Sequence, residues 1–245
     1  MVSSLVGRAA WRTGRMGVTQ QAVAPSLFKN LPYNFITGLA PVSMFADGPF
    51  ILVIRPGLRV ENLPQLLAMI KEKGESMNFG SSGPGGIPHL AGAALNKATG
   101  AKVTHVPFTG TAPAFAALLG DQIDYLFADV SALSSIQAGK VKAIGVTTDK
   151  RISALPAVPA MSETLPGFVM SSWVAIDAPA GTPRPIIDRL NAAIQKASKS
   201  AALTQRYETI STRPLWTTPE QYGVFKAAEV QKYDQLVKEF GIKID

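Results

Sequence analysis

The strongest chemical signal in the chain is a glycine- and serine-rich stretch over residues 80–86. It follows an apolar, strand-like segment and precedes a helix-like segment that begins near Ile87. Glycine lets the backbone turn tightly and approach a ligand closely. The hydroxyls of Ser81 and Ser82, the backbone at Gly83 and the free N–H groups of the next helix could together form a cradle for an anion such as a carboxylate. A plain turn between strand and helix is the alternative interpretation.

Three catalytic or nucleotide-binding motifs come close to this stretch, and each fails at a defined position. A phosphate loop needs lysine where the chain has Gly86, although Gly80 and Gly85 have the required spacing. A nucleophile elbow around Ser82 needs glycine where the chain has Pro84. The glycines also stand in the wrong order for a dinucleotide fingerprint. The loop is therefore predicted to hold a ligand and not to react with it.

Two further units of the same design follow in the sequence. The strand-like segment 103–108 leads into Thr109, Gly110 and Thr111 and the helical run 114–119. The strand-like segment 123–128 leads into Asp129 and another helical stretch, and 141–146 is a further short strand. Strands that alternate with helices predict an α/β fold with a parallel sheet, in which ligands bind beyond the carboxyl ends of the strands. The predicted ligand-binding residues at these ends are Ser81, Ser82, Thr109, Thr111 and Asp129.

Composition excludes several other classes of protein. The chain has 245 residues, a hydrophobic content of 47%, a formal charge of +7 and no cysteine. The cysteine count excludes disulfides, thiolate metal sites, a cysteine nucleophile and a lipid-modified cysteine anchor. The basic residues are scattered without a recognition motif, so no nucleic-acid partner is predicted.

The two histidines, His89 and His105, do not have the spacing of a metal site, and no metal or cofactor is predicted. His89 stands just inside a predicted helix start, where it caps the helix or lines the ligand site, and His105 lies in a strand and is interpreted as structural. Trp173 lies in the strand-like segment 171–176 and faces either the ligand site or the core. Helices are predicted from 186 to 197 and from Pro219 to about residue 240.

Many segments, in the same order and with the same spacing, resemble a known family from about residue 17 to the C-terminus. The family is that of the tripartite tricarboxylate transporter receptors, called TctC or Bug, which are periplasmic solute-binding proteins. The matching segments are PSLFKNLPY (25–33), APVS (40–43), FGSSG (79–83), HLAG (89–92), HVPFTG (105–110), LGDQ (119–122), AGKV (138–141), LPAVP (155–159), APAGTP (178–183), and TPE (218–220) through to GIKID (241–245).

The resemblance implies a two-lobed periplasmic-binding-protein-like fold of type II with parallel-dominated sheets. The second lobe would comprise residues 53–146, and the first lobe residues 1–52 and 147–245. The implied function is non-catalytic: a monomeric periplasmic receptor captures a small carboxylate and delivers it to membrane permease subunits. Carried over from the family, the ligand-binding positions are Ser81, Ser82, Gly83, Thr109, Gly110, Thr111, Asp129, Thr19, Gln20 and Gln21. The family commonly has histidine at the position of Gln21.

The start of the chain departs from the family. The strand, glycine-rich loop and helices that open the family fold have no counterpart, and residues 1–16 match nothing in the pattern. These residues also lack the basic start and apolar core of a secretory signal. The first lobe is therefore expected to be incomplete, through a truncated gene or a start site placed too late. Two alternatives follow: a non-functional truncated family member, or an α/β enzyme that uses Asp129.

Overall fold

The computed structural model describes residues 15–209 and 212–242, so most of the unmatched N-terminal stretch lies outside the described residues. The chain divides into two compact units. Of the described residues, the first unit contains 15–47, 173–207 and 213–235, and the second contains 48–172, 208–209, 212 and 236–242. The segment 147–172, which the sequence interpretation assigned to the first lobe, belongs to the second unit in this division. The predicted lobe boundaries at residues 53 and 146 stay a prediction.

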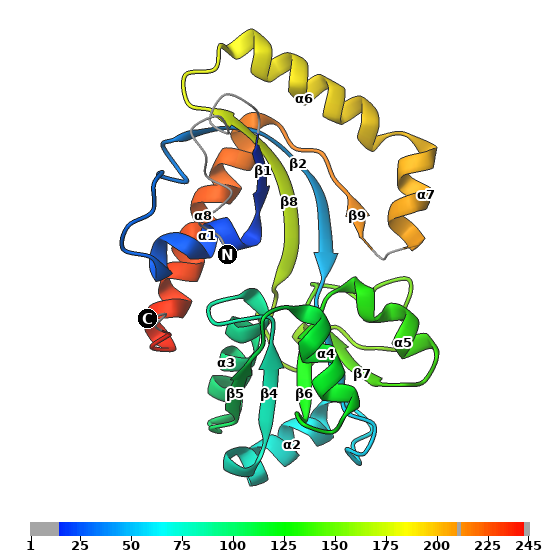
Figure 1. The fold of residues 1–245 in the computed structure, drawn as a ribbon. Coiled ribbons are helices and arrows are strands. Elements are labelled where there is room, and N and C mark those ends of the chain that lie inside the picture. The colour runs from blue at the N-terminus through cyan, green and yellow to red at the C-terminus, as the bar shows by residue number, and fades with distance from the viewer. Residues whose placement is uncertain (1–14, 210–211, 243–245) are drawn as a thin grey trace. The chain divides into compact units, whose positions relative to one another are not determined.

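The second unit is built on a five-stranded sheet in the order β5-β4-β6-β3-β7 (Figure 1). The strand β4 pairs in parallel with β5 and β6, whereas β3 pairs antiparallel with β6 and β7. Four of the five strands therefore run in one direction, and β3 runs against them. The strands are β3 (Ile51–Ile54), β4 (Asn78–Ser81), β5 (Thr104–Pro107), β6 (Tyr125–Ala128) and β7 (Lys142–Val146).

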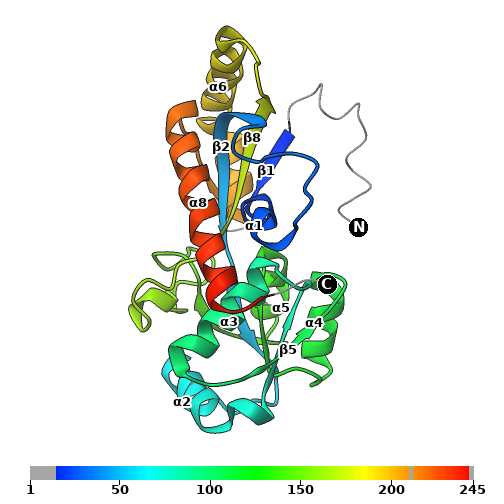
Figure 2. The same ribbon diagram turned by 90° about the vertical axis from the view of Figure 1, so that its left-hand side faces the viewer.

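Helices cover both faces of this sheet, with α3 and α4 on opposite sides (Figures 1 and 2). The chain passes from β4 through α3 to β5, then returns through α4 to β6, so the two crossovers run in opposite directions along the sheet. Right-handed crossovers of opposite direction place their helices on opposite faces. The helices of this unit are α2 (Leu63–Lys73), α3 (Ile87–Thr99), α4 (Thr111–Leu119) and α5 (Leu133–Gln137).

The central strands are buried on both faces, because helices lie above and below them. All four residues of β3 and all four of β6 are buried, as expected for continuous apolar runs between two layers of helices. The start of β6 is fastened to β4 by Asp124, whose carboxylate accepts from Arg55 Nε at 2.9 Å and from the Asn78 backbone N–H at 2.9 Å. These bonds fix the register in which the carboxyl ends of the strands meet.

The first unit contains a sheet in the order β1-β8-β2-β9. The pairs β1–β8 and β2–β9 are antiparallel, so the predicted dominance of parallel strands describes the second unit. The strands are β1 (Arg15–Val18), β2 (Leu39–Pro49), β8 (Ser171–Pro179) and β9 (Arg213–Pro214). The helices are α1 (Thr19–Leu27), α6 (Arg184–Ser198), α7 (Ala201–Thr209) and α8 (Pro219–Glu239).

Strand β8 carries two different faces because successive side chains alternate across a sheet. Trp173 and Asp177 are buried and bonded to residues of α8: Trp173 Nε1 donates to Glu229 at 2.9 Å, and Asp177 accepts from Lys226 at 2.8 Å. Ala178 on the alternate face packs with residues of β2 and α6 in a small apolar cluster. The open question over Trp173 is therefore settled in favour of the core.

The predicted helices of the C-terminal part are present, because their end signals are local. The Thr218 hydroxyl accepts from the Gln221 backbone N–H at 3.2 Å, and the Gln221 side-chain oxygen accepts from the Thr218 backbone N–H at 3.0 Å, which makes a capping box at the start of α8. Gly241 has a φ of +60°, which suits a residue that ends a helix in the left-handed region. None of the helices within the described ranges has the length and apolar character that a membrane span requires.

Candidate ligand-binding site

The three predicted loops emerge at one edge of the second unit's sheet. In the parallel register Ser81 lies opposite Pro107, so the end of β4 and the end of β5 are adjacent. The strand β6 lies on the other side of β4 and leads to Asp129. The chain leaves β4 toward β5 but leaves β6 toward β7, which makes the gap between β4 and β6 a topological switch point. Ligands of open α/β sheets bind at such a point.

The loop after β4 is held in shape by its own first serine. Ser81 is only 1% exposed, and its hydroxyl bonds to the carbonyl of Gly83 at 3.0 Å and to the Gly83 N–H at 3.2 Å. The hydroxyl also lies 2.7 Å from His105 Nε2. Gly83 has a φ of +140°, a conformation that favours glycine. Ser82 is half-buried, and within the described ranges its hydroxyl has no hydrogen-bond partner.

A pair of stacked imidazoles supports this loop. The rings of His89 and His105 lie 3.7 Å apart at 9°, and Phe79 packs against both. His89 Nδ1 accepts the backbone N–H of Gly85 at 3.0 Å. Burial lowers the pKa of His89, and burial together with the neighbouring His89 lowers the pKa of His105 to about 4.

The loops after β5 and β6 are joined by one contact. The Thr111 hydroxyl donates to Asp129 at 3.4 Å, and Asp129 also accepts the Ser131 N–H at 2.9 Å. Asp129 thereby caps the short helix of Val130–Ala132. Gly110 precedes α4 with a φ of +151°, and the exposed Thr109 has a hydroxyl without a hydrogen-bond partner among the described residues.

Two helix N-termini open onto this edge, α3 after residue 86 and α4 after residue 110. The first backbone N–H groups of a helix have no partner within the helix, and the helix dipole makes this end favourable for an anion. Neither helix has an acidic residue in its first turn. The edge therefore offers neutral donors, with Asp129 as the one charged side chain in the three loops.

The three predicted residues of the first unit have different surroundings. Thr19 is 1% exposed, and its hydroxyl accepts the Trp173 backbone N–H at 2.9 Å. Gln21 accepts the Val18 N–H at 3.2 Å and thereby caps the start of α1, while Gln20 is exposed. Thr19 and Gln21 thus have local structural partners, and the ligand-binding role predicted for all three residues stays a prediction.

Ser81 and His105 have the separation of a nucleophile and its base, but their surroundings do not suit that chemistry. The serine is buried, and its hydroxyl is bonded within the loop. A histidine with a pKa of about 4 is a weak base at neutral pH. No group of three or more potential metal ligands occurs within the ranges that the structure describes. The geometry therefore favours holding a ligand.

Sequence reasoning missed the contacts of the two histidines. The sequence predicted a structural role for His105 in a strand, but not its contact with Ser81. It predicted that His89 caps the helix or lines the ligand site, but not its bond to Gly85. The FGSSG and HVPFTG segments each indicate a strand followed by a turn, which is local information. The contact between Ser81 and His105 depends on the pairing of β4 with β5.

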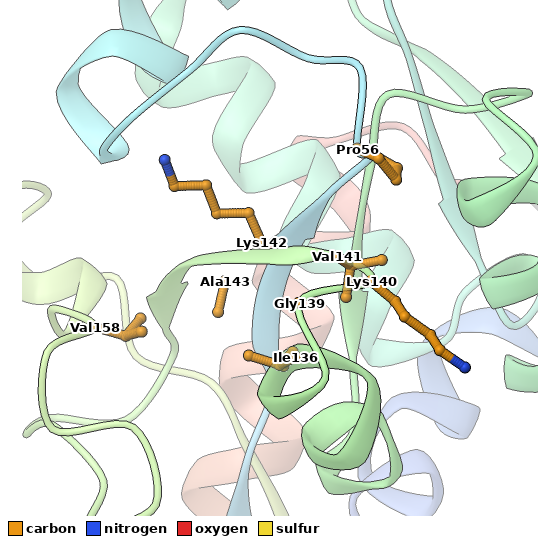
Figure 3. Close-up of a pocket in the computed structure, with 8 residues that line it drawn as sticks. All are labelled: Pro56, Ile136, Gly139, Lys140, Val141, Lys142, Ala143 and Val158. Atoms are coloured by element: carbon orange, nitrogen blue, oxygen red, sulfur yellow. The ribbon is translucent and has the colours of Figure 1, made fainter.

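A shallow groove of about 440 Å³ lies elsewhere in the second unit (Figure 3). It surrounds the amino end of β7, whereas the predicted residues lie at the carboxyl ends of β4, β5 and β6. Lys140 and Lys142 extend in opposite directions from it (Figure 3), and Lys142 is paired with Glu61 at 2.5 Å. The lining residues are Pro56, Ile136, Gly139, Lys140, Val141, Lys142, Ala143 and Val158, none of which is a predicted ligand-binding residue.

Most of this chain can be aligned with the sequences of known proteins. Protein BugT of Bordetella pertussis is 34% identical over 225 residues, which cover 91% of this chain and 69% of BugT. A UPF0065 protein of Agrobacterium vitis is 33% identical over 226 residues, which cover 90% of this chain and 65% of that protein. The chain thus spans about two thirds of the length of these relatives.

Solved structures share the fold. The periplasmic binding protein BugD is 30% identical with a TM-score of 0.82, and the match covers 94% of this chain and 79% of BugD. MatC from Rhodopseudomonas palustris, solved with bound malate, is 28% identical with a TM-score of 0.79, and the match covers 92% of this chain and 79% of MatC. Residues 12–242 match the tripartite tricarboxylate transporter family receptor, TctC. The chain therefore belongs to the TctC family of solute-binding receptors, and its fold is that of the periplasmic binding proteins.

Proposed function

We propose that this chain binds a small carboxylate through neutral donors at the carboxyl edge of the second unit's sheet. The observation that carries the proposal is the grouping of two hydroxyls, those of Ser82 and Thr109, with the N-termini of α3 and α4 at one edge. Neither hydroxyl has a hydrogen-bond partner among the described residues. Hydroxyl and amide donors directed at a carboxylate supply charge-assisted hydrogen bonds. The family membership and the malate bound to MatC support a carboxylate as the ligand.

The residues of the site have separate roles in this proposal. Ser82 and Thr109 donate to the ligand carboxylate, and the backbone at Gly83, Gly110 and Thr111 lets the ligand approach the helix termini. Asp129 accepts hydrogen bonds only, so it receives one from a ligand hydroxyl or an ordered water and not from the carboxylate. Thr19, Gln20 and Gln21 are the candidates from the first unit.

The remaining parts of the proposal rest on the family. The receptor acts as a monomer in the periplasm and delivers its ligand to the membrane permease subunits of a tripartite tricarboxylate transport system. It does so without catalysis. The predicted lobes of residues 53–146 and of residues 1–52 with 147–245 are part of the same proposal.

Ser82→Ala is expected to weaken malate binding by about 1–2 kcal/mol, or about 5- to 30-fold in Kd, because a hydrogen bond to a charged group is lost. The melting temperature of the free protein should change little, since the Ser82 hydroxyl has no hydrogen-bond partner among the described residues. Isothermal titration calorimetry with malate and a thermal melt without ligand measure the two quantities.

Ser81→Ala is the matched control one residue away. Its hydroxyl is buried and bonded to Gly83 and His105, so its removal should lower the stability of the free protein by about 1–3 kcal/mol. Malate should raise the melting temperature of the parent chain, and the diamide of malate should not, because it carries no charge. If Ser82→Ala lowered the melting temperature and left malate affinity unchanged, the loop would be a structural turn. If no carboxylate stabilised the parent chain, the chain would lack receptor function.

A further inference from the structure

We propose that His89 and His105 are positioning residues of the ligand site: their stacked rings hold the loop of residues 81–86 in its ligand-binding shape, and protonation of His89 releases it. The inference rests on the proposed function for its effect on ligand binding. The effect on the loop itself can be measured without any ligand. Two contacts carry the argument, one from each ring to the loop.

The contact of His89 fixes its protonation state. A backbone N–H can only donate, so the bond from Gly85 N–H to His89 Nδ1 at 3.0 Å requires that this nitrogen carry no proton. A proton on Nδ1 would convert the acceptor into a donor and bring two N–H groups against each other. The bond at Gly85 therefore exists only while His89 is neutral, with its proton on Nε2.

The Ser81 hydroxyl has a single proton, which decides the direction of its hydrogen bond with His105. That proton is directed to the Gly83 carbonyl at 3.0 Å, and the oxygen accepts the Gly83 N–H at 3.2 Å. The Ser81 oxygen also lies 2.7 Å from His105 Nε2, and this contact is a hydrogen bond when the imidazole donates its Nε2–H to the serine oxygen. His105 therefore holds Ser81, and Ser81 in turn holds the turn at Gly83.

The stacking of the two rings couples their protonation. Their centroids lie 3.7 Å apart, so a proton on one ring raises the cost of a proton on the other. Phe79 packs against both rings at 6.3 and 5.0 Å, which shields them partly from water. The other titratable groups on the elements around the pair include Tyr125 of β6, which stacks on Phe79, and Lys97 of α3, which is paired with Glu239. Glu75, Lys102 and Asp124 stand near the starts of the strands.

The sign of the pH effect follows from these states. The folded chain disfavours the imidazolium, and the pKa of His105 is about 4 against an ordinary value of 6.5. The unfolded chain thus binds more protons between these values, and the stability due to the neutral pair is lost as the pH falls from 6.5 toward 4. Burial also lowers the pKa of His89, so the bond from Gly85 should be lost, and the loop should loosen, as the pH falls below the ordinary value of 6.5. A new cation near an anionic ligand would by itself tighten binding. Malate also takes up protons in acid and then binds more weakly, so the effect of positioning is the difference between the parent chain and His89→Gln, which cannot titrate.

The experiment compares two substitutions at each ring in the full chain. His89→Gln keeps an acceptor and cannot titrate, whereas His89→Leu has no acceptor. His105→Gln keeps a donor, whereas His105→Leu has none. The readouts are backbone amide exchange at Gly83 and Gly85 without ligand, and malate affinity by calorimetry, both measured between pH 4 and 7.5.

The expected results differ between the pairs. In the parent chain, the protection of the Gly85 amide, corrected for intrinsic exchange, and malate affinity should both fall about tenfold as the pH is lowered toward 4. His89→Gln should keep the protection at neutral pH and lose its pH dependence. His89→Leu should lose about tenfold of the protection at every pH. His105→Gln should keep the protection of the Gly83 amide and His105→Leu should lose about tenfold of it, at every pH, because His105 carries its donor in both protonation states.

Several results would overturn the inference. One is a Gly85 amide that stays protected in His89→Leu, and another is malate affinity in the parent chain that rises steadily on acidification. If the leucine variants fail to fold, an NMR titration of the parent chain decides the question, because the inference requires the Gly85 amide to change together with the imidazole protons of His89. If the amides respond as expected but the chain binds no carboxylate, the proposed function is contradicted, whereas the role of the histidines in shaping the loop is supported.

Discussion

Replacing Lys226 by methionine is expected to destabilise the first unit by about 3–5 kcal/mol, because it leaves the charge of Asp177 buried without its partner. The two side chains are 2% and 0% exposed, and Lys226 Nζ lies 2.8 Å from Asp177 Oδ1. Tyr222 donates to the other carboxylate oxygen at 2.9 Å, and the ammonium group lies 4.3 Å from the centre of the Phe35 ring. Burial raises the pKa of Asp177 and lowers that of Lys226, while each charge favours the charged form of the other.

Urea denaturation of Lys226→Met measures the loss in free energy of unfolding. The double variant Asp177→Leu with Lys226→Met should recover much of it, because no unpaired charge then remains in the core. Arg184→Ala is the surface control: its partners Asp188 and Glu220 are exposed, and its loss should cost less than about 1 kcal/mol. Equal losses for the Lys226 and Arg184 variants would show that burial does not determine the importance of the pair.

Replacing Phe79 by alanine is expected to destabilise the second unit by about 3–5 kcal/mol, the usual cost of emptying a buried aromatic site. Phe79 is 1% exposed and stacks on Tyr125, with ring centres 5.6 Å apart, while it also covers His89 and His105. The variant should also bring water to the two histidines and raise their pKa toward the ordinary value of 6.5. Chemical denaturation and an NMR titration of the imidazole protons measure the two effects.

Gly92 provides a matched test of the same contact from α3. A Cβ atom at this position would lie 2.1 Å from the Phe79 ring, so Gly92→Ala should destabilise the parent chain through overpacking. In the Phe79→Ala background the ring is absent, and the same substitution should be neutral or favourable, because alanine is the better helix former. Additive effects of the two substitutions would show that the ring and the helix do not meet as described.

The elements of this protein follow from local sequence. The short strands β4 to β7, the glycine-rich loop and the helix α8 with its Thr218 cap are set by residues within a few positions of one another. Such signals act between residues that are close in sequence. Hydrophobic patterns, glycines at turns and helix caps can therefore be recognised from the sequence alone. The order of strands and loops also predicted that the ligand site lies at the carboxyl edge of the sheet.

Only the tertiary structure decided which polar groups remain available. Both serines of the loop have the same local signal, yet the pairing of β4 with β5 places Ser81 against His105 and leaves the Ser82 hydroxyl without a hydrogen-bond partner in the part of the chain that the structure describes. In the first unit, the Thr19 hydroxyl bonds to the backbone of Trp173, 154 residues away in sequence. The antiparallel direction of β3 was also decided by the tertiary structure, because an apolar strand has the same sequence pattern whichever way it runs in the sheet. Such choices depend on contacts between distant segments, and no local preference encodes which segments meet.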